Sequence, residues 1–330
     1  MDPLSQGALG AAAALVVAKP EQVRGAALLG ALSGMAPDLD VLIRSSSDPL
    51  LFLEYHRQFT HSLIFIPLGA LLCSLIARPL IRDKISNQSL YGFCLLGYGS
   101  HGLLDACTSY GTQLLWPFSD LRIAWNNVSV VDPLFTLPLL IAVAVAAVRR
   151  SPQMARFGVI WAMAYLLLGV AQRERAESLG SELAASRGHV PSGLVAKPAF
   201  GSLLLWKTIY EYEDRLYVDA ARLGVGARSF PGESASKLDM RRDLQWLAPD
   251  SQQARDIERF RWFSGGQLAL DPAGNDRIID VRYSMVPNRI EALWGIQLDR
   301  AAAPGAHVNF FTSRSPSKEQ RAETLRMLFQ

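Results

Sequence analysis

The stretch His101-Gly102-Leu103-Leu104-Asp105 lies at the end of an apolar run, residues 90–107, that is typical of a membrane helix. Its histidine and aspartate are four residues apart, which on a helix is about 40° of rotation, so both side chains share one face. Ionisable groups in apolar spans cost about 2.5–3.5 kcal/mol each on insertion scales, and they usually serve function. An imidazole and a carboxylate on one face, near a membrane boundary, make half of a metal site.

Two further stretches offer the other half. Pro37-Asp38-Leu39-Asp40 follows a short apolar run, and the proline breaks the helix there because it lacks a backbone donor. His56-Arg57-Gln58-Phe59-Thr60-His61-Ser62 precedes the next run. Its two histidines are five residues apart, about 140° on a helix, so we expect His56 in a loop that bends back to the site. This clustering favours a metal site over a hydrogen-bonded packing element between helices.

The apolar runs predict the fold class. Half of the 330 residues are hydrophobic, and the long apolar runs fall in the first 171. Residues 1–172 are therefore predicted to form an all-α bundle of about six short transmembrane helices, over residues 4–18, 25–36, 62–77, 90–107, 134–148 and 157–171. The first two runs are shorter than the roughly 20 residues that a spanning helix needs. We therefore expect them to pack half-buried against neighbouring helices or to form a re-entrant hairpin.

Residues 173–330 are predicted to form a small soluble α+β domain. Strand-like runs occur at residues 203–210, 215–218, 280–283 and 292–298, and helices are expected at 173–185 and 256–263. His189 and His307 lack partners at ligand spacing, so we expect them on the surface. The net charge of +3 is too small to indicate nucleic-acid binding, and the three cysteines all lie in apolar runs, which indicates no disulfide framework.

The basic residues between the runs predict the orientation. If six runs cross, one side holds eight lysines and arginines and the other holds three: Lys19, Arg24, Arg78, Arg82, Lys84, Arg149, Arg150 and Arg156 against Arg44, Arg57 and Arg122. The positive-inside rule places the larger set in the cytoplasm. All candidate ligands then lie at the periplasmic face, and residues 173–330 are periplasmic. Asp120 and Asp132 fall on the same face, and whether they join the site stays open.

In their order along the chain, the three motifs resemble those of the YdjM-like family, whose members are described as bacterial inner-membrane, metal-dependent hydrolases. The resemblance covers residues 1–175, and the strand around Leu205-Trp206-Lys207 is similar, less specifically, to the downstream part of longer members. Carried over position by position, it implies a multi-pass protein of the inner membrane and this functional set: Asp38, Asp40, His56, His61, His101 and Asp105.

The candidate residues suggest a mechanism. Carboxylates with imidazoles suit a divalent transition metal such as Zn²⁺ or Mn²⁺, and six candidates allow one or two ions. Metal-activated water would hydrolyse a lipid or lipid-linked substrate, with Asp40 as general base and Arg57 favouring a phosphoester. Two other classes stay open. One is a metal-ion transporter, and the other is a non-catalytic anchor with a structural metal that presents residues 173–330 to a protein partner.

Overall fold

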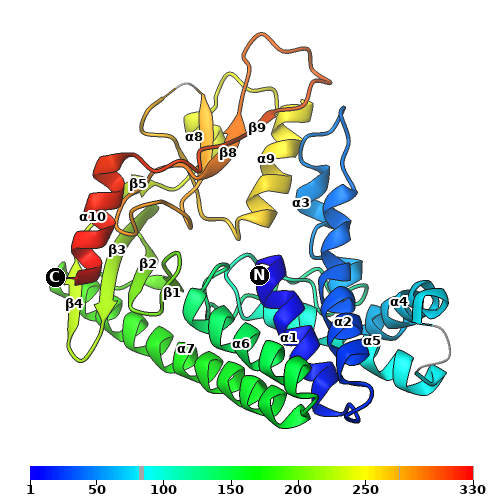
Figure 1. The fold of residues 1–330 in the computed structure, drawn as a ribbon. Helices are drawn as coiled ribbons and strands as arrows, with labels where there is room; N and C mark the ends of the chain where they lie inside the picture. The colour runs from blue at the N-terminus through cyan, green and yellow to red at the C-terminus, as the bar shows by residue number, and fades with distance from the viewer. Residues whose placement is uncertain (82–84, 275, 330) are drawn as a thin grey trace. The chain divides into compact units, whose positions relative to one another are not determined.

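The computed structural model describes residues 1–81, 85–274 and 276–329 (Figure 1). Two compact units share the chain. The first comprises Met1–Ile43, Tyr55–Ala171 and Phe200–Ser202, and the second comprises Arg44–Glu54, Gln172–Ala199 and Leu203–Gln330. Residues 44–54 thus belong to the second unit, although the chain on both sides of them belongs to the first. Arg82 and Lys84 of the predicted basic loop lie outside the described residues.

The first unit is helical. Its elements are α1 (Pro3–Val16), α2 (Val23–Met35), the 3₁₀ turns η1 (Ala36–Leu42), η2 (Phe59–His61) and η3 (Leu63–Phe65), α4 (Ile66–Ile81), α5 (Asn87–Ala106), α6 (Pro133–Arg149) and α7 (Pro152–Ser186) as far as Ala171. Each predicted apolar run lies on one of these helices. As predicted, the regular helix does not continue through Pro37, because α2 passes into the tighter turn η1 there.

The structure does not support a count of six transmembrane helices. Among the described residues, three segments are long and apolar enough to cross a bilayer, namely Val23–Leu42, Leu63–Ile81 and Pro152–Ser186. Helices α1 and α6 are apolar but have only 14 and 17 residues, too few to cross about 30 Å of hydrocarbon at about 1.5 Å per residue. Helix α5 has 20 residues, but its polar side chains, His101 and Asp105 among them, keep its hydropathy below that of the three spans.

Glycine contacts bring α1, α2 and α5 together. A Cβ on Gly10 of α1 would lie 2.3 Å from the carbonyl oxygen of Gly30 on α2, and a Cβ on Gly30 would meet the Gly10 carbonyl at the same distance. A Cβ on Gly97 of α5 would lie 2.4 Å from the Gly30 carbonyl oxygen. Only glycine permits backbones this close. Helix α2 is therefore fixed against both neighbours, which brings η1, its continuation, beside the C-terminal part of α5.

The second unit contains two antiparallel sheets. The larger has the order β1-β2-β3-β4, with β5 also paired to β3, and the smaller has the order β6-β7-β8-β9. The strands are β1 (Ser192–Pro198), β2 (Leu205–Tyr212), β3 (Arg215–Leu223), β4 (Ala227–Phe230), β5 (Ser234–Ser236), β6 (Leu268–Leu270), β7 (Arg277–Asp280), β8 (Trp294–Gln297) and β9 (Asn309–Thr312). Buried Ile209, Val218 and Ile279 belong to one core cluster that both sheets share.

Short helices complete this unit. They are α3 (Leu51–Tyr55), α8 (Met240–Asp243), α9 (Gln252–Phe263) and α10 (Lys318–Phe329). All of α3 except its last residue, Tyr55, belongs to the second unit. The predicted order, a helical part followed by a sheet-rich part, is confirmed. The predicted strand at 280–283 is displaced, because β7 ends at Asp280 and a turn follows.

His189 and His307 belong to neither group of candidate ligands, as predicted, but both rings are half-buried, and each has a partner that the sequence did not indicate. The ring of His189 stacks on Tyr212 with a centroid separation of 4.3 Å. His307 Nδ1 lies 2.9 Å from the buried Asp256 carboxylate. Sequence spacing gave no sign of either contact, since each joins residues that are distant along the chain.

The glycine contacts predict a difference between two Gly→Ala substitutions. Gly30→Ala forces a Cβ against backbone, so the free energy of unfolding should fall by about 1–3 kcal/mol, as for other overpacked sites. Gly92→Ala on α5 is the matched control, because a Cβ there meets nothing within 4 Å. The control should be neutral or slightly stabilising. Denaturation in detergent measures both, and equal stabilities would contradict the packing described.

Candidate metal centre

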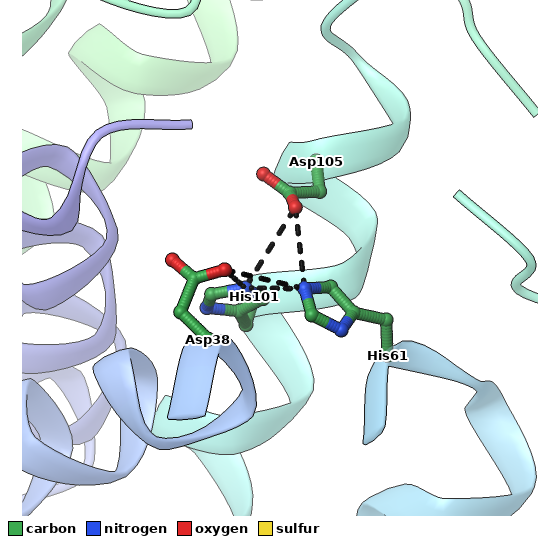
Figure 2. A group of neighbouring side chains, drawn as sticks. All are labelled: Asp38, His61, His101 and Asp105. Carbon is green, nitrogen blue, oxygen red and sulfur yellow. Dashed lines mark hydrogen bonds and ion pairs between the residues drawn. The ribbon is translucent and has the colours of Figure 1, made fainter. Parts of the chain in front are cut away.

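Four side chains from three stretches of the first unit converge on one point (Figure 2). Asp38 comes from η1, His61 from the end of η2, and His101 and Asp105 from the last turns of α5. One ligand atom of each lies within 4.8 Å of all the others. The predicted shared face of α5 is confirmed, since His101 Nε2 lies 3.8 Å from Asp105 Oδ2.

Local sequence explains how His61 reaches this point. Arg57 adopts a left-handed backbone conformation with φ of 67°, which separates α3 from η2. The Arg57 amide then donates to Asp40 Oδ2 at 3.0 Å, and the Thr60 hydroxyl donates to the same oxygen at 2.8 Å. On α5, a Cβ at position 102 would lie 2.4 Å from the His61 carbonyl oxygen, so Gly102 lets the His61 backbone approach the helix.

The spacing of the four ligand atoms fits a tetrahedral ion. His61 Nε2 and His101 Nε2 are 2.9 Å apart. Asp38 Oδ1 lies 3.5 Å from the first nitrogen and 3.4 Å from the second, and Asp105 Oδ2 lies 3.3 Å and 3.8 Å from them. Metal–ligand bonds of about 2.0–2.2 Å in a tetrahedral site place ligand atoms roughly 3.4 Å apart. The residues therefore fit such an ion with shifts of a few tenths of an ångström.

Hydrogen bonds fix both imidazoles in the tautomer that a metal needs. His101 Nδ1 lies 2.6 Å from the Gly34 carbonyl oxygen, which can only accept, so Nδ1 carries the proton. His61 Nδ1 lies 2.9 Å from Thr60 Oγ1 and 3.3 Å from Asp40 Oδ2, so it too is the donor. In the neutral form of each ring, Nε2 then presents a lone pair to the centre. This carbonyl or carboxylate support behind a ligating histidine is the usual outer shell of a metal site.

The electrostatics of the centre favour a cation. Burial lowers the pKa of His61, but hydrogen bonds to the carboxylates of Asp105, Asp38 and Asp40 outweigh it and raise the pKa to about 10. Asp105 Oδ2 is buried and makes no hydrogen bond of good geometry, although Arg57 Nε lies 2.9 Å away. Without a metal, His61 therefore holds a proton at Nε2, 2.9 Å from His101 Nε2. A divalent ion would replace that proton and bind both Nε2 atoms beside the Asp105 carboxylate.

Asp40 and His56 form a second group with Asp38 that offers ligand atoms within 4.8 Å of one another. Asp40 Oδ1 lies 2.7 Å from His56 Nδ1, while Oδ2 accepts from Arg57 and Thr60. Both oxygens of Asp40 are therefore engaged, whereas the His56 side chain is 31% exposed. All six predicted residues thus lie in one cluster, in two groups that share Asp38.

Arg57 is part of this cluster and not a free surface cation. Its side chain is 5% exposed, and Nη1 donates to Thr108 Oγ1 at 3.0 Å. Asp105 Oδ1 accepts from Gln6 Nε2 at 2.9 Å and also contacts the Met1 amino group. The sequence did not identify Gln6, Thr60 and Thr108, which hydrogen-bond to the cluster. Of these three, only Thr60 could have been found from the sequence, because it directly precedes His61.

Asp120 and Asp132, whose part in the site the sequence left undecided, lie outside both groups of candidate ligands. Asp132 caps α6, accepting from the amides of Leu134 and Phe135, and it accepts from the Tyr165 hydroxyl at 2.9 Å. Asp120 is exposed. Asp132 therefore has a structural role in the first unit, and neither residue belongs with the candidate ligands.

Comparison with known proteins places the chain in a family. The family model described as YdjM inner membrane protein matches residues 1–176, and the chain belongs to this family, as predicted. The uncharacterized protein YfhP of Bacillus subtilis (strain 168) is 27% identical over 164 residues, 49% of this chain and 48% of the relative. The inner membrane protein YbcI of Escherichia coli (strain K12) is 36% identical over 105 residues, 31% of this chain and 60% of the relative.

The chain therefore aligns with about half to three fifths of the length of these curated relatives. No solved structure gives a significant match. The family and the name of YbcI support a location in the inner membrane. The matched region contains every candidate ligand, and Arg57 as well.

The centre predicts graded losses of metal affinity. Purified without chelator, the protein should hold or take up Zn²⁺ or Mn²⁺, measured by elemental analysis and titration. His101→Ala and Asp105→Asn remove ligands and should weaken binding by more than about 100-fold, beyond the 10–100-fold typical of an outer-shell change such as Asp40→Asn. His189→Ala is the control and should bind like the wild type. Failure of the wild-type protein to bind either ion would refute the site.

Proposed function

We propose that this member of the YdjM inner membrane protein family is a metal-dependent hydrolase that cleaves a phosphoester of a lipid or lipid-linked molecule at the periplasmic face. The observation that supports it is the four-atom group of two carboxylates and two imidazoles. A structural zinc site is usually closed and often rich in cysteine. Here the Asp38 side chain is 22% exposed and His56 lies beside it, so this edge of the group is open to water.

The roles of the residues follow from their contacts. When bound, a divalent transition metal supplies Lewis acidity to a substrate oxygen and lowers the pKa of a water. Asp38, His61, His101 and Asp105 would hold it. Asp40 and Thr60 orient the His61 ring through Nδ1. These contacts fix the Nδ1 side of the imidazole, so that its Nε2 faces the point where the metal would bind.

Proton transfer falls to the Asp40–His56 pair. Asp40 holds His56 Nδ1 at 2.7 Å, and the ring is partly exposed, so its other nitrogen can exchange a proton with water at the open edge. His56 then takes the proton at its exposed nitrogen, and Asp40, whose own oxygens are engaged, orients the ring and stabilises its protonated form. Arg57, next to Asp105, contributes positive charge that favours an anionic substrate.

An apolar groove supports a lipid substrate. It has a volume of about 520 Å³ and runs over α1, α2 and α6 of the first unit. Its lining is almost wholly apolar and includes Leu4, Leu28, Met35, Leu140 and Val143. Met35 directly precedes η1, which carries Asp38. An acyl chain in this groove would extend to the turn that carries the ligands.

The charges at the helix ends support a periplasmic location of the ligand cluster. The span Val23–Leu42 has Arg24 at one end and Asp38 near the other. The span Leu63–Ile81 follows His61 and ends after Arg78. Helix α7 begins just after Arg149 and Arg150. By the positive-inside rule, the basic ends of these three spans lie in the cytoplasm and the ligand ends lie outside.

This orientation has a direct test. An alkaline phosphatase fusion after residue 330 should be active, because that reporter works only outside the cytoplasm, and a fusion within residues 78–87 should be inactive. Cysteine labelling with a membrane-impermeant reagent provides an independent control, since Ser47→Cys should react in intact spheroplasts and Ser151→Cys should not. The reverse pattern would show that the site faces the cytoplasm.

The chemistry is tested with purified protein, added metal and a panel of phospholipids and lipid-linked phosphates. Asp40→Asn and His56→Ala should each lower the rate about 10²–10⁴-fold, the usual loss for a general base. Metal content should fall far less in these variants than in His61→Ala. His189→Ala, in the second unit, should keep the wild-type rate. Unchanged rates in Asp40→Asn, His61→Ala and Asp105→Asn would remove the hydrolase proposal and favour the anchor.

A further inference from the structure

The eleven residues 44–54 lie within the connection between Asp40 and His56, yet they belong to the second unit. Asp48 precedes the short helix α3 and accepts from the Leu50 amide at 3.0 Å. Glu54 lies in the last turn of α3, two residues before His56. A carboxylate thus stands at each end of the helix that leads directly to the metal cluster.

One guanidinium binds both carboxylates. Arg259 of α9 forms a bidentate pair with Asp48, from Nη1 at 3.0 Å and from Nη2 at 2.8 Å, and its Nε donates to Glu54. All these residues lie within the second unit. The planar guanidinium of an arginine has five N–H donors and can bind two carboxylates at once, whereas a lysine ammonium is a single point charge. Burial raises the pKa of Asp48, but hydrogen bonds from Arg259 and Leu50 outweigh it and lower the pKa.

Arg259 is itself held firmly. Its Nη1 also donates to Asp256 at 2.9 Å, and Asp256 is fully buried. The Asp256 carboxylate accepts from the Val308 amide at 3.1 Å and lies 2.9 Å from His307 Nδ1. Beside this polar network, Phe52 of α3 packs edge-to-face on Phe310 of β9 with centroids 5.1 Å apart. Residues of α9 and β9 therefore hold α3 by both charge and apolar contact.

The chain then carries this placement to the metal cluster. Two residues after Glu54, His56 meets Asp40, and the next amide, that of Arg57, donates to the same carboxylate. We propose that Arg259 is a positioning residue for the metal centre. By binding Asp48 and Glu54 it fixes α3, and α3 sets where His56 and Arg57 meet Asp40. Arg259 lies outside residues 1–176, the range that the family model matches, whereas the six candidate ligands lie inside it.

This inference rests on the proposed metal function, so the test begins with metal-free protein. The full-length chain in detergent is compared as wild type, Arg259→Ala and Arg261→Ala by hydrogen–deuterium exchange of peptides covering residues 50–58. Arg261 is the matched control, because it lies on the same helix and pairs with Glu258 of that helix. Arg259→Ala should speed exchange in these peptides about 10-fold or more, as expected for a segment that opens locally, and Arg261→Ala should not.

The second measurement is the dissociation constant for Zn²⁺. Arg259→Ala should weaken binding about 10–100-fold, the range for outer-shell changes, and Arg261→Ala should leave it unchanged. Arg259→Lys keeps the charge without the fork and should give an intermediate loss. The double variant Asp48→Asn, Glu54→Gln should reproduce Arg259→Ala, which tests the same contacts if that variant folds poorly.

The outcomes separate the proposals. Exchange that matches the Arg261→Ala control would overturn the inference, and so would faster exchange with an unchanged dissociation constant. Faster exchange with weaker binding supports it. If the wild-type protein takes up no Zn²⁺ or Mn²⁺, the proposed function fails. Exchange in the metal-free protein then still decides whether Arg259 sets the contact between Arg57 and Asp40.

Discussion

Two imidazole nitrogens, His61 Nε2 and His101 Nε2, face each other across 2.9 Å at the centre of the ligand group in the first unit. His61 and His101 each use Nδ1 as a donor to a fixed oxygen, so the two Nε2 lone pairs point at one another. Such a pair is repulsive unless a cation or a proton lies between them. The surrounding carboxylates of Asp38 and Asp105 supply the charge that such a cation needs.

The helices are built to bring these groups together despite the cost of placing charge among apolar segments. Gly30 allows α2 to touch α1 and α5, and Gly102 allows the His61 backbone to touch α5. Pro37 ends the regular helix just before Asp38, and the 3₁₀ turn places Asp40 two residues, about two thirds of a turn, further along. Small residues therefore set the geometry, while the polar residues supply the chemistry. This division explains why short, imperfect helices carry the site.

The candidate ligands were predictable because their signal is local. An Asp or His beside an apolar run is unusual on its own, and the i, i+4 spacing of His101 and Asp105 fixes their shared face. The number of spans was not predictable from apolar runs alone, since α1 and α6 are too short and α5 too polar. Gln6, Thr108 and Arg259 were missed because their contacts join residues more than 50 positions apart. No period or motif carries such information.

The placement of residues 44–54 in the second unit has a consequence for biosynthesis. The ion pair between Asp48 and Arg259 can form only after Arg259 has been synthesised, 211 residues later. At about 5–20 residues per second, the ribosome needs roughly 10–40 s to bridge that interval. During this time the first helices can enter the membrane, but the connection between Asp40 and His56 has no anchor. The order of synthesis would therefore delay completion of the site until the C-terminal part of the chain has been made and folded.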